Sequence, residues 1–84
     1  MDSRFQISDP LKDVFGDSLN FYVIDGDETV AARVSLIALS VLARGEHPQV
    51  AFARNKERIR KVAYAVRRAN PKVGLLTLNA THFL

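Results

Sequence analysis

The chain has no cysteine and only four glycines, and each shortage excludes a class of protein. A secreted domain of this size usually needs disulfides, so the lack of cysteine favours a reducing, cytoplasmic environment. The glycines are scattered and form neither a P-loop nor a Gly-x-Gly-x-x-Gly sequence, so no phosphate-binding loop is predicted. We therefore expect no cofactor.

Long apolar runs are also missing. The most apolar stretch, residues 34–43, is about ten residues long, whereas a helix that spans a bilayer needs about 20. The first ten residues are mixed in charge and do not resemble a signal peptide. We expect a cytoplasmic protein that makes no contact with a membrane.

What remains is the composition of one small globular domain. The chain has 84 residues, of which 48% are hydrophobic and 25% charged, and this is enough apolar area to argue against disorder. A chain of this length buries a modest share of its surface, so its stability margin should be thin or be supplemented by self-association.

Charge is distributed unevenly along the chain. Residues 1–51 hold four basic and eight acidic side chains, whereas residues 52–84 hold eight basic side chains and one acidic. Such asymmetry indicates contact with nucleic acid or a membrane. It is equally expected of a protein whose two halves neutralise each other, or of one that associates head to tail.

The first half of the chain has the alternation of β-strands. Residues 19–24 alternate with period two, Asp25-Gly26 predicts a tight turn, and residues 29–34 form the returning strand of a hairpin. Short strands are also indicated near residues 4–8, ended by Asp9-Pro10, and near residues 14–15. We set residues 1–17 apart as a segment that is partly ordered or a short strand, before a single domain of residues 18–84.

The second half has the periodicity of helices. Ser35 is placed to cap a first helix that Gly45 ends and that should be well buried, because it is apolar on several sides. A second helix is expected over residues 49–69, with an apolar stripe from Phe52 to Ala69, followed by a strand at residues 75–78 and a final turn with Phe83. The order predicts an α+β two-layer sandwich: hairpin, two helices and a final strand, with a mostly antiparallel sheet and both helices on one face.

Three short motifs resemble a known family. They are VSLIAL at residues 34–39, FARNKERI at residues 52–59, and GLLTL at residues 74–78 with a terminal Phe83. The pattern is similar to that of the small bacterial proteins of the domain of unknown function 1488 family, over roughly residues 14–84. Lys56 and His82 depart from it, since that family usually has arginine and aspartate there. The resemblance implies a compact α+β fold and a bacterial origin, and it implies no activity.

The basic side chains of the second helix are the first candidate site. The residues that could contact phosphates or a protein partner are Arg54, Arg58, Arg60, Lys61, Arg67 and Arg68. Cations on a rigid helix can neutralise nucleic-acid phosphates. However, they surround most of the helix rather than form a stripe, and only Tyr64 offers a ring for stacking. Neutralisation by the acidic half of the chain is the favoured interpretation, and contact with nucleic acid or with a protein partner is the alternative.

Asn55 is the one polar residue inside the predicted apolar stripe. A buried amide without a hydrogen-bond partner costs on the order of 1–3 kcal/mol. We therefore expect Asn55 to be a buried structural residue, bonded to the backbone of a strand or of the preceding loop. The alternative is an amide that recognises a ligand.

Residue patterns for catalysis and metal binding are missing from the sequence. His47 and His82 lie 35 positions apart without cysteines, which is not a zinc pattern. The acidic residues near Gly26 are too close together for a calcium loop and are typical of a turn. No serine lies in a Gly-x-Ser-x-Gly sequence. We expect no enzyme activity and no bound metal.

The face of the hairpin opposite the helices carries Tyr22, Ile24 and Ala31, which is moderate apolar area for a small domain. The sequence therefore favours a non-catalytic protein-interaction or structural module, self-associating as a homodimer or bound to another protein. Nucleic-acid binding through the basic helix at residues 50–69 is the alternative.

Overall fold

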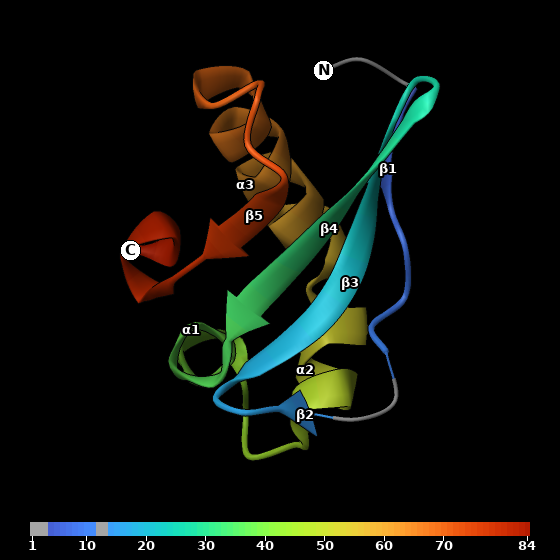
Figure 1. Cartoon of the computed structure of the whole chain (residues 1–84). Coiled ribbons are helices and arrows are strands. Elements are labelled where there is room, and N and C mark those ends of the chain that lie inside the picture. The colour runs from blue at the N-terminus through green and yellow to red at the C-terminus, as the bar shows by residue number, and fades with distance from the viewer. Residues whose placement is uncertain (1–3, 12–13) are drawn as a thin grey trace.

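A long hairpin forms the centre of the sheet in the computed structural model, which describes residues 4–11 and 14–84 (Figure 1). The elements in chain order are β1 (Phe5–Ile7), β2 (Val14–Phe15), β3 (Ser18–Asp25), β4 (Glu28–Ser35), α1 (Leu36–Leu42), α2 (Pro48–Arg54), α3 (Lys56–Ala69), β5 (Leu75–Leu78) and the 3-10 helix η1 (Ala80–Phe83). The predicted α+β class is confirmed.

The sheet has the order β1-β3-β4-β5, and β2 also pairs with β3. The pairs β1–β3, β2–β3 and β3–β4 are antiparallel, whereas β4 and β5 are parallel. Parallel neighbours need a long crossover connection, and α1, α2 and α3 supply it. The sheet is therefore mostly antiparallel, as predicted, with one parallel pair at its edge.

Both hairpin turns consist of a glycine followed by an aspartate. Asp25 pairs with Glu28 across the β3–β4 turn, so the turn residues are Gly26 and Asp27, and the predicted Asp25-Gly26 turn was wrong by one position. Gly26 has a φ of 62° and no non-glycine residue described has a positive φ, which is the pattern of a type II′ turn. The shift places the carboxylates of Asp25 and Glu28 opposite each other.

α1 begins where the sequence predicted and ends earlier. The Ser35 hydroxyl accepts a hydrogen bond from the Ala38 amide at 3.0 Å, which confirms the cap. The helix ends at Leu42, and Gly45 lies in the following loop rather than at the helix end. The predicted burial was also wrong in part, because the side chains of Ile37 and Val41 are exposed.

The predicted single helix over residues 49–69 is two helices. α2 ends at Arg54 and α3 begins at Lys56, with Asn55 between them at φ −111° and ψ 21°. Asparagine favours such breaks because its side chain competes with the backbone for hydrogen bonds. The break still leaves Phe52 on α2 and Ile59 on α3 fully buried.

α2 and α3 pack against one face of the sheet, and the other face has no helix over it (Figure 1). Phe21 of β3 meets Phe52 of α2 edge-on, with ring centroids 5.1 Å apart. Phe5 of β1 meets Tyr64 of α3 in the same way at 5.1 Å. The segment of residues 1–17 thus contributes Phe5, Ile7 and two strands to the domain, while residues 1–3 and 12–13 lie outside the described part.

Candidate functional site

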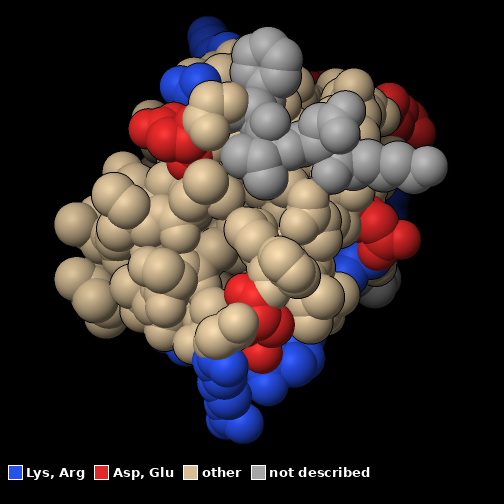
Figure 2. All heavy atoms as spheres, turned by 90° about the horizontal axis from the view of Figure 1, so that it is seen from below, with Lys and Arg blue, Asp and Glu red and all other residues tan. Residues whose placement is uncertain are grey.

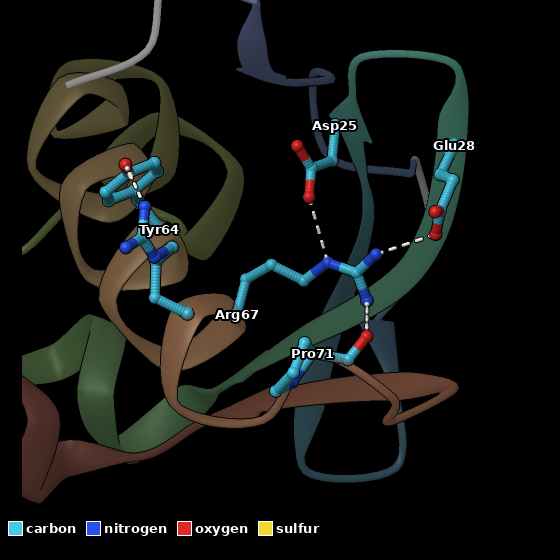
Figure 3. Close-up of polar contacts among 6 residues, drawn as sticks. Asp25, Glu28, Tyr64, Arg67 and Pro71 are labelled. Carbon is cyan, nitrogen blue, oxygen red and sulfur yellow. Dashed lines mark hydrogen bonds and ion pairs between the residues drawn. The ribbon is translucent and has the colours of Figure 1, made fainter.

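Arg67 connects α3 to the tip of the central hairpin (Figure 3). Its Nε donates to Asp25 at 3.0 Å, one terminal nitrogen donates to Glu28 at 2.7 Å, and the other donates to the Pro71 carbonyl at 2.8 Å. The side chain is only 9% exposed. This arrangement holds a cation of the basic half of the chain between two anions of the acidic half.

The hydrogen bond from Arg67 to Asp25, helped by Glu28, raises the pKa of the guanidinium above its ordinary value. Planar guanidinium groups suit such sites because several donors project from one rigid fork. Each of the three nitrogens of Arg67 therefore donates within the chain, and the buried side chain is not available to a phosphate. Its role is to position the hairpin against the helix.

Other cations of the candidate set also have partners in the chain. Arg60 donates to both carboxylate oxygens of Glu57, at 2.9 and 2.8 Å, and to the Phe5 carbonyl at 2.8 Å. Arg58 donates to the Phe83 carbonyl at 2.7 Å. These bonds join α3 to β1 and to η1, which are remote in the sequence. The Glu57 carboxylate has a lowered pKa because Arg60 donates to it.

The remaining cations are more exposed. Arg54 lies 3.5 Å from Glu46, and Lys56, which is outside the candidate set, lies 2.9 Å from Asp9. Arg68 stacks over the ring of Tyr64 at 5.7 Å and donates to its hydroxyl at 3.1 Å. Because Tyr64 already receives Arg68, it is a poor platform for a nucleic-acid base.

Lys61 is exposed and has no hydrogen bond or ion pair to any described residue. Among the six candidates, it alone makes no hydrogen bond or ion pair within the described part of the chain, although its charge helps to lower the pKa of Glu57. A single cation free of hydrogen bonds and ion pairs would bind phosphates weakly, since affinity grows with the number of phosphates neutralised.

Asn55 takes a different partner from the one predicted. Its side-chain amide donates to the Ala51 carbonyl of α2 at 2.8 Å, and not to a strand or to the loop before the helix. The residue is partly buried rather than buried. Its role is to end α2 and to begin α3, and its own carbonyl accepts from Ile59 at 2.9 Å.

A largely apolar surface lies at the end of the molecule formed by α1 and α2, with charged side chains at its border (Figure 2). Ile37 and Val41, one turn apart on α1, have 70% and 47% of their surface exposed, and Val50 at the start of α2 has 49%. A groove of about 320 Å3 lies beside them, with Leu36, Ala43 and Pro48 among its lining residues. We call this the α1–α2 surface.

A second hollow lies on the sheet face that the helices leave open. Tyr22, Ala31 and Leu75 form one row across β3, β4 and β5. Because alanine is small, the row has a low centre between two larger side chains, and the hollow there has a volume of about 400 Å3. Leu11 and Arg33 also line it. We call this the open sheet face.

Neither histidine belongs to a metal site. His82 Nδ1 accepts from the Asn79 amide at 3.0 Å as part of a capping box at η1, and His47 precedes α2. The described residues contain no group of three or more potential ligands that could hold a metal ion. No helix in the described ranges is long and apolar enough to cross a bilayer.

Comparison with known proteins gives no relative for this chain: no family model matches it, and neither does any curated protein or solved structure.

Proposed function

We propose that the protein is a non-catalytic interaction module of the cytoplasm that binds other protein chains through its two exposed apolar surfaces. One observation carries this proposal: exposed apolar groups lie on the α1–α2 surface and on the open sheet face, while most cations of α3 are held by the protein's own acceptors. A helix face with a protruding isoleucine and valine beside a groove is suited to apolar contact with another protein.

The family resemblance is retained as a proposal. The FARNKERI motif that carries it surrounds Asn55, at which α2 ends and α3 begins. A residue that sets the break between two core helices is a physical reason for such a motif. We propose on that basis that the chain is a bacterial protein of the domain of unknown function 1488 family.

The test of the interaction module is site-specific photocrosslinking in the cytoplasm of a cell that expresses the chain. A photoreactive residue replaces Val41 on the α1–α2 surface in one sample, Tyr22 on the open sheet face in a second, and Lys61 on the basic helix in a third. We expect protein adducts from Val41 or Tyr22 and none from Lys61. If neither of the two apolar positions gives a protein adduct, the proposal is wrong.

Nucleic-acid binding through α3 is the alternative, and it needs a separate measurement. Random duplex and single-stranded nucleic acid are titrated with the protein across a salt series. Contact with phosphates predicts an affinity that falls with log salt, with a slope of roughly −0.9 for each phosphate neutralised on a duplex. We expect no binding at physiological salt and a shallow slope at low salt, because few cations of α3 remain uncommitted. A steep slope that Lys61→Ala and Arg68→Ala reduce would favour the alternative.

A further inference from the structure

The open sheet face carries one cation and one anion that have no ionic partner among residues 4–11 and 14–84. Arg33 on β4 makes a single long hydrogen bond, 3.4 Å from its Nε to the Thr77 hydroxyl. Asp17, in the β2–β3 turn, has no side-chain hydrogen bond or ion pair to the described residues. Both residues line the same hollow as Tyr22, Ala31 and Leu75. This contrasts with α2 and α3, where carboxylates lie within ion-pair distance of Arg54, Arg60 and Arg67.

The two charges sit at different heights on the sheet. Arg33 is paired with Asn20 in the register of β3 and β4, whereas Asp17 immediately precedes Ser18, which is paired with Ser35. The two backbone positions are thus about three residues apart along β3, roughly 10 Å at the rise of a strand. No hydrogen bond or ion pair joins the two side chains within the chain.

A second copy of the chain satisfies both charges at once. In a two-fold interface every contact is made twice, so Arg33 of one copy meets Asp17 of the other, and Asp17 of the first meets Arg33 of the second. Both pairs can form together because the distance between Arg33 and Asp17 is the same in the two copies, and the two-fold rotation reverses their order. A nucleic acid or an anionic lipid surface would meet Arg33 favourably and Asp17 unfavourably.

The shape and composition of this face fit the same partner. The hollow over Ala31 lies beside Tyr22, which is 43% exposed, so the tyrosine of one copy can enter the hollow of the other. Tyrosine and arginine are the residue types that contribute most to protein interfaces. Sheets that pack face to face lie about 10 Å apart, and this distance is filled by interdigitating side chains.

We propose that the open sheet face is a homodimer interface, in which two sheets pack face to face and Arg33 pairs with Asp17 across the two-fold axis. This inference rests on the proposed function and names the partner of one of its two surfaces as a second copy. The dimer has four layers, with helices outside and the two sheets inside. The α1–α2 surface of each copy stays accessible to other proteins.

The test is a charge swap measured by sedimentation equilibrium from micromolar to millimolar protein. Arg33→Asp leaves two aspartates at each ionic contact, and Asp17→Arg leaves two arginines, so each variant alone should dimerise at least tenfold more weakly. An equimolar mixture of the two variants restores opposite charges at both contacts and should recover the dimer. Ile37→Asp, on the α1–α2 surface, is the matched control and should dimerise like the unmodified chain.

The mixture separates loss of an interface from loss of folding, because two misfolded variants do not restore each other. A chain of monomeric mass at millimolar concentration overturns the inference. The inference is also overturned if both single variants still dimerise as strongly as the unmodified chain, or if their mixture does not recover the dimer. It is overturned as well if Ile37→Asp abolishes the dimer. If the chain is monomeric and Val41 still crosslinks to other proteins, the dimer is refuted and the interaction module stands. If the apolar positions give no protein adducts, the module itself is refuted.

Discussion

Replacing Arg67 by methionine tests whether the positive charge of α3 is neutralised by acidic groups of the same chain. Methionine keeps an unbranched apolar stem, so the packing of the helix against the sheet changes little. It removes the three hydrogen bonds of the guanidinium, at 3.0 Å to Asp25, 2.7 Å to Glu28 and 2.8 Å to Pro71. The tip of the β3–β4 hairpin then loses its polar connection to α3.

The expected cost follows from the exposure of each partner. A hydrogen bond to a charged group contributes about 1.5–3 kcal/mol, but Glu28 and Asp25 have 71% and 36% of their side chains exposed. Water therefore replaces part of what the carboxylates lose. We expect a total destabilisation of about 2–3 kcal/mol, below the simple sum of three such bonds.

The assay is urea unfolding followed by circular dichroism. With a urea m-value of about 1 kcal/mol/M for a small domain, the midpoint should fall by about 2 M with an unchanged slope. The melting temperature should fall by roughly 10–20 °C, since 1 kcal/mol corresponds to about 4–8 °C at this size. Lys61→Met is the control, and as an exposed substitution it should change stability by less than about 0.5 kcal/mol.

Equal stabilities for Arg67→Met and Lys61→Met would refute the reasoning, because the buried guanidinium would then contribute no more than a solvated lysine. A double-mutant cycle with Asp25→Asn sharpens the test. The cycle should give a coupling energy of at least about 0.5 kcal/mol if the two residues interact as described. A coupling near zero would show that methionine acts by disturbing the packing of α3.

Three further predictions follow from single contacts. Ser35→Ala should destabilise the chain by about 1 kcal/mol in urea unfolding, because the hydroxyl caps α1; an unchanged midpoint would contradict the cap. Phe52→Ala should cost about 3–5 kcal/mol, since the ring is fully buried against Phe21, and the dispersion of the amide NMR spectrum should collapse. Glu57 has a lowered pKa because Arg60 donates to it, so its contribution is present above the unfolded value of about 4.3 and is lost as pH falls through the folded pKa. Glu57→Gln should therefore lower stability at pH 7 and converge with the unmodified chain once the pH is below the folded pKa of Glu57; a difference independent of pH would refute this.

Local patterns were sufficient for most of the secondary structure. Alternation located the strands, and the hydroxyl of Ser35 located the start of α1, because these depend on neighbours a few residues away. The break at Asn55 was missed because helical periodicity continues through it, with Phe52 and Ile59 on one face. The signal that could have revealed it is the asparagine itself, since its amide can bond to the carbonyl four residues before it.

The sequence predicted Arg67 to be one of the exposed cations. At 100° per residue, a helical projection places it about 40° beyond Ala63, just outside the apolar stripe. It lies four residues after Ala63 and eight after Ile59, and the three residues share one buried face in the structure. No local pattern tells which acids meet it, because Asp25 lies 42 positions away in the sequence.

The sequence by itself determined that the chain forms an α+β domain with a central hairpin, and that its charge is divided between an acidic and a basic half. Those properties follow from composition, periodicity and the geometry of short turns. Only the tertiary structure decided which charged side chains pair with each other and which apolar side chains remain exposed. Only folding brings Arg67 to the hairpin tip, leaves Arg33 and Asp17 without ionic partners among the described residues, and exposes Ile37. Periodicity shows which face of an element is apolar, but whether that face is covered depends on the packing of elements that are far apart in the chain.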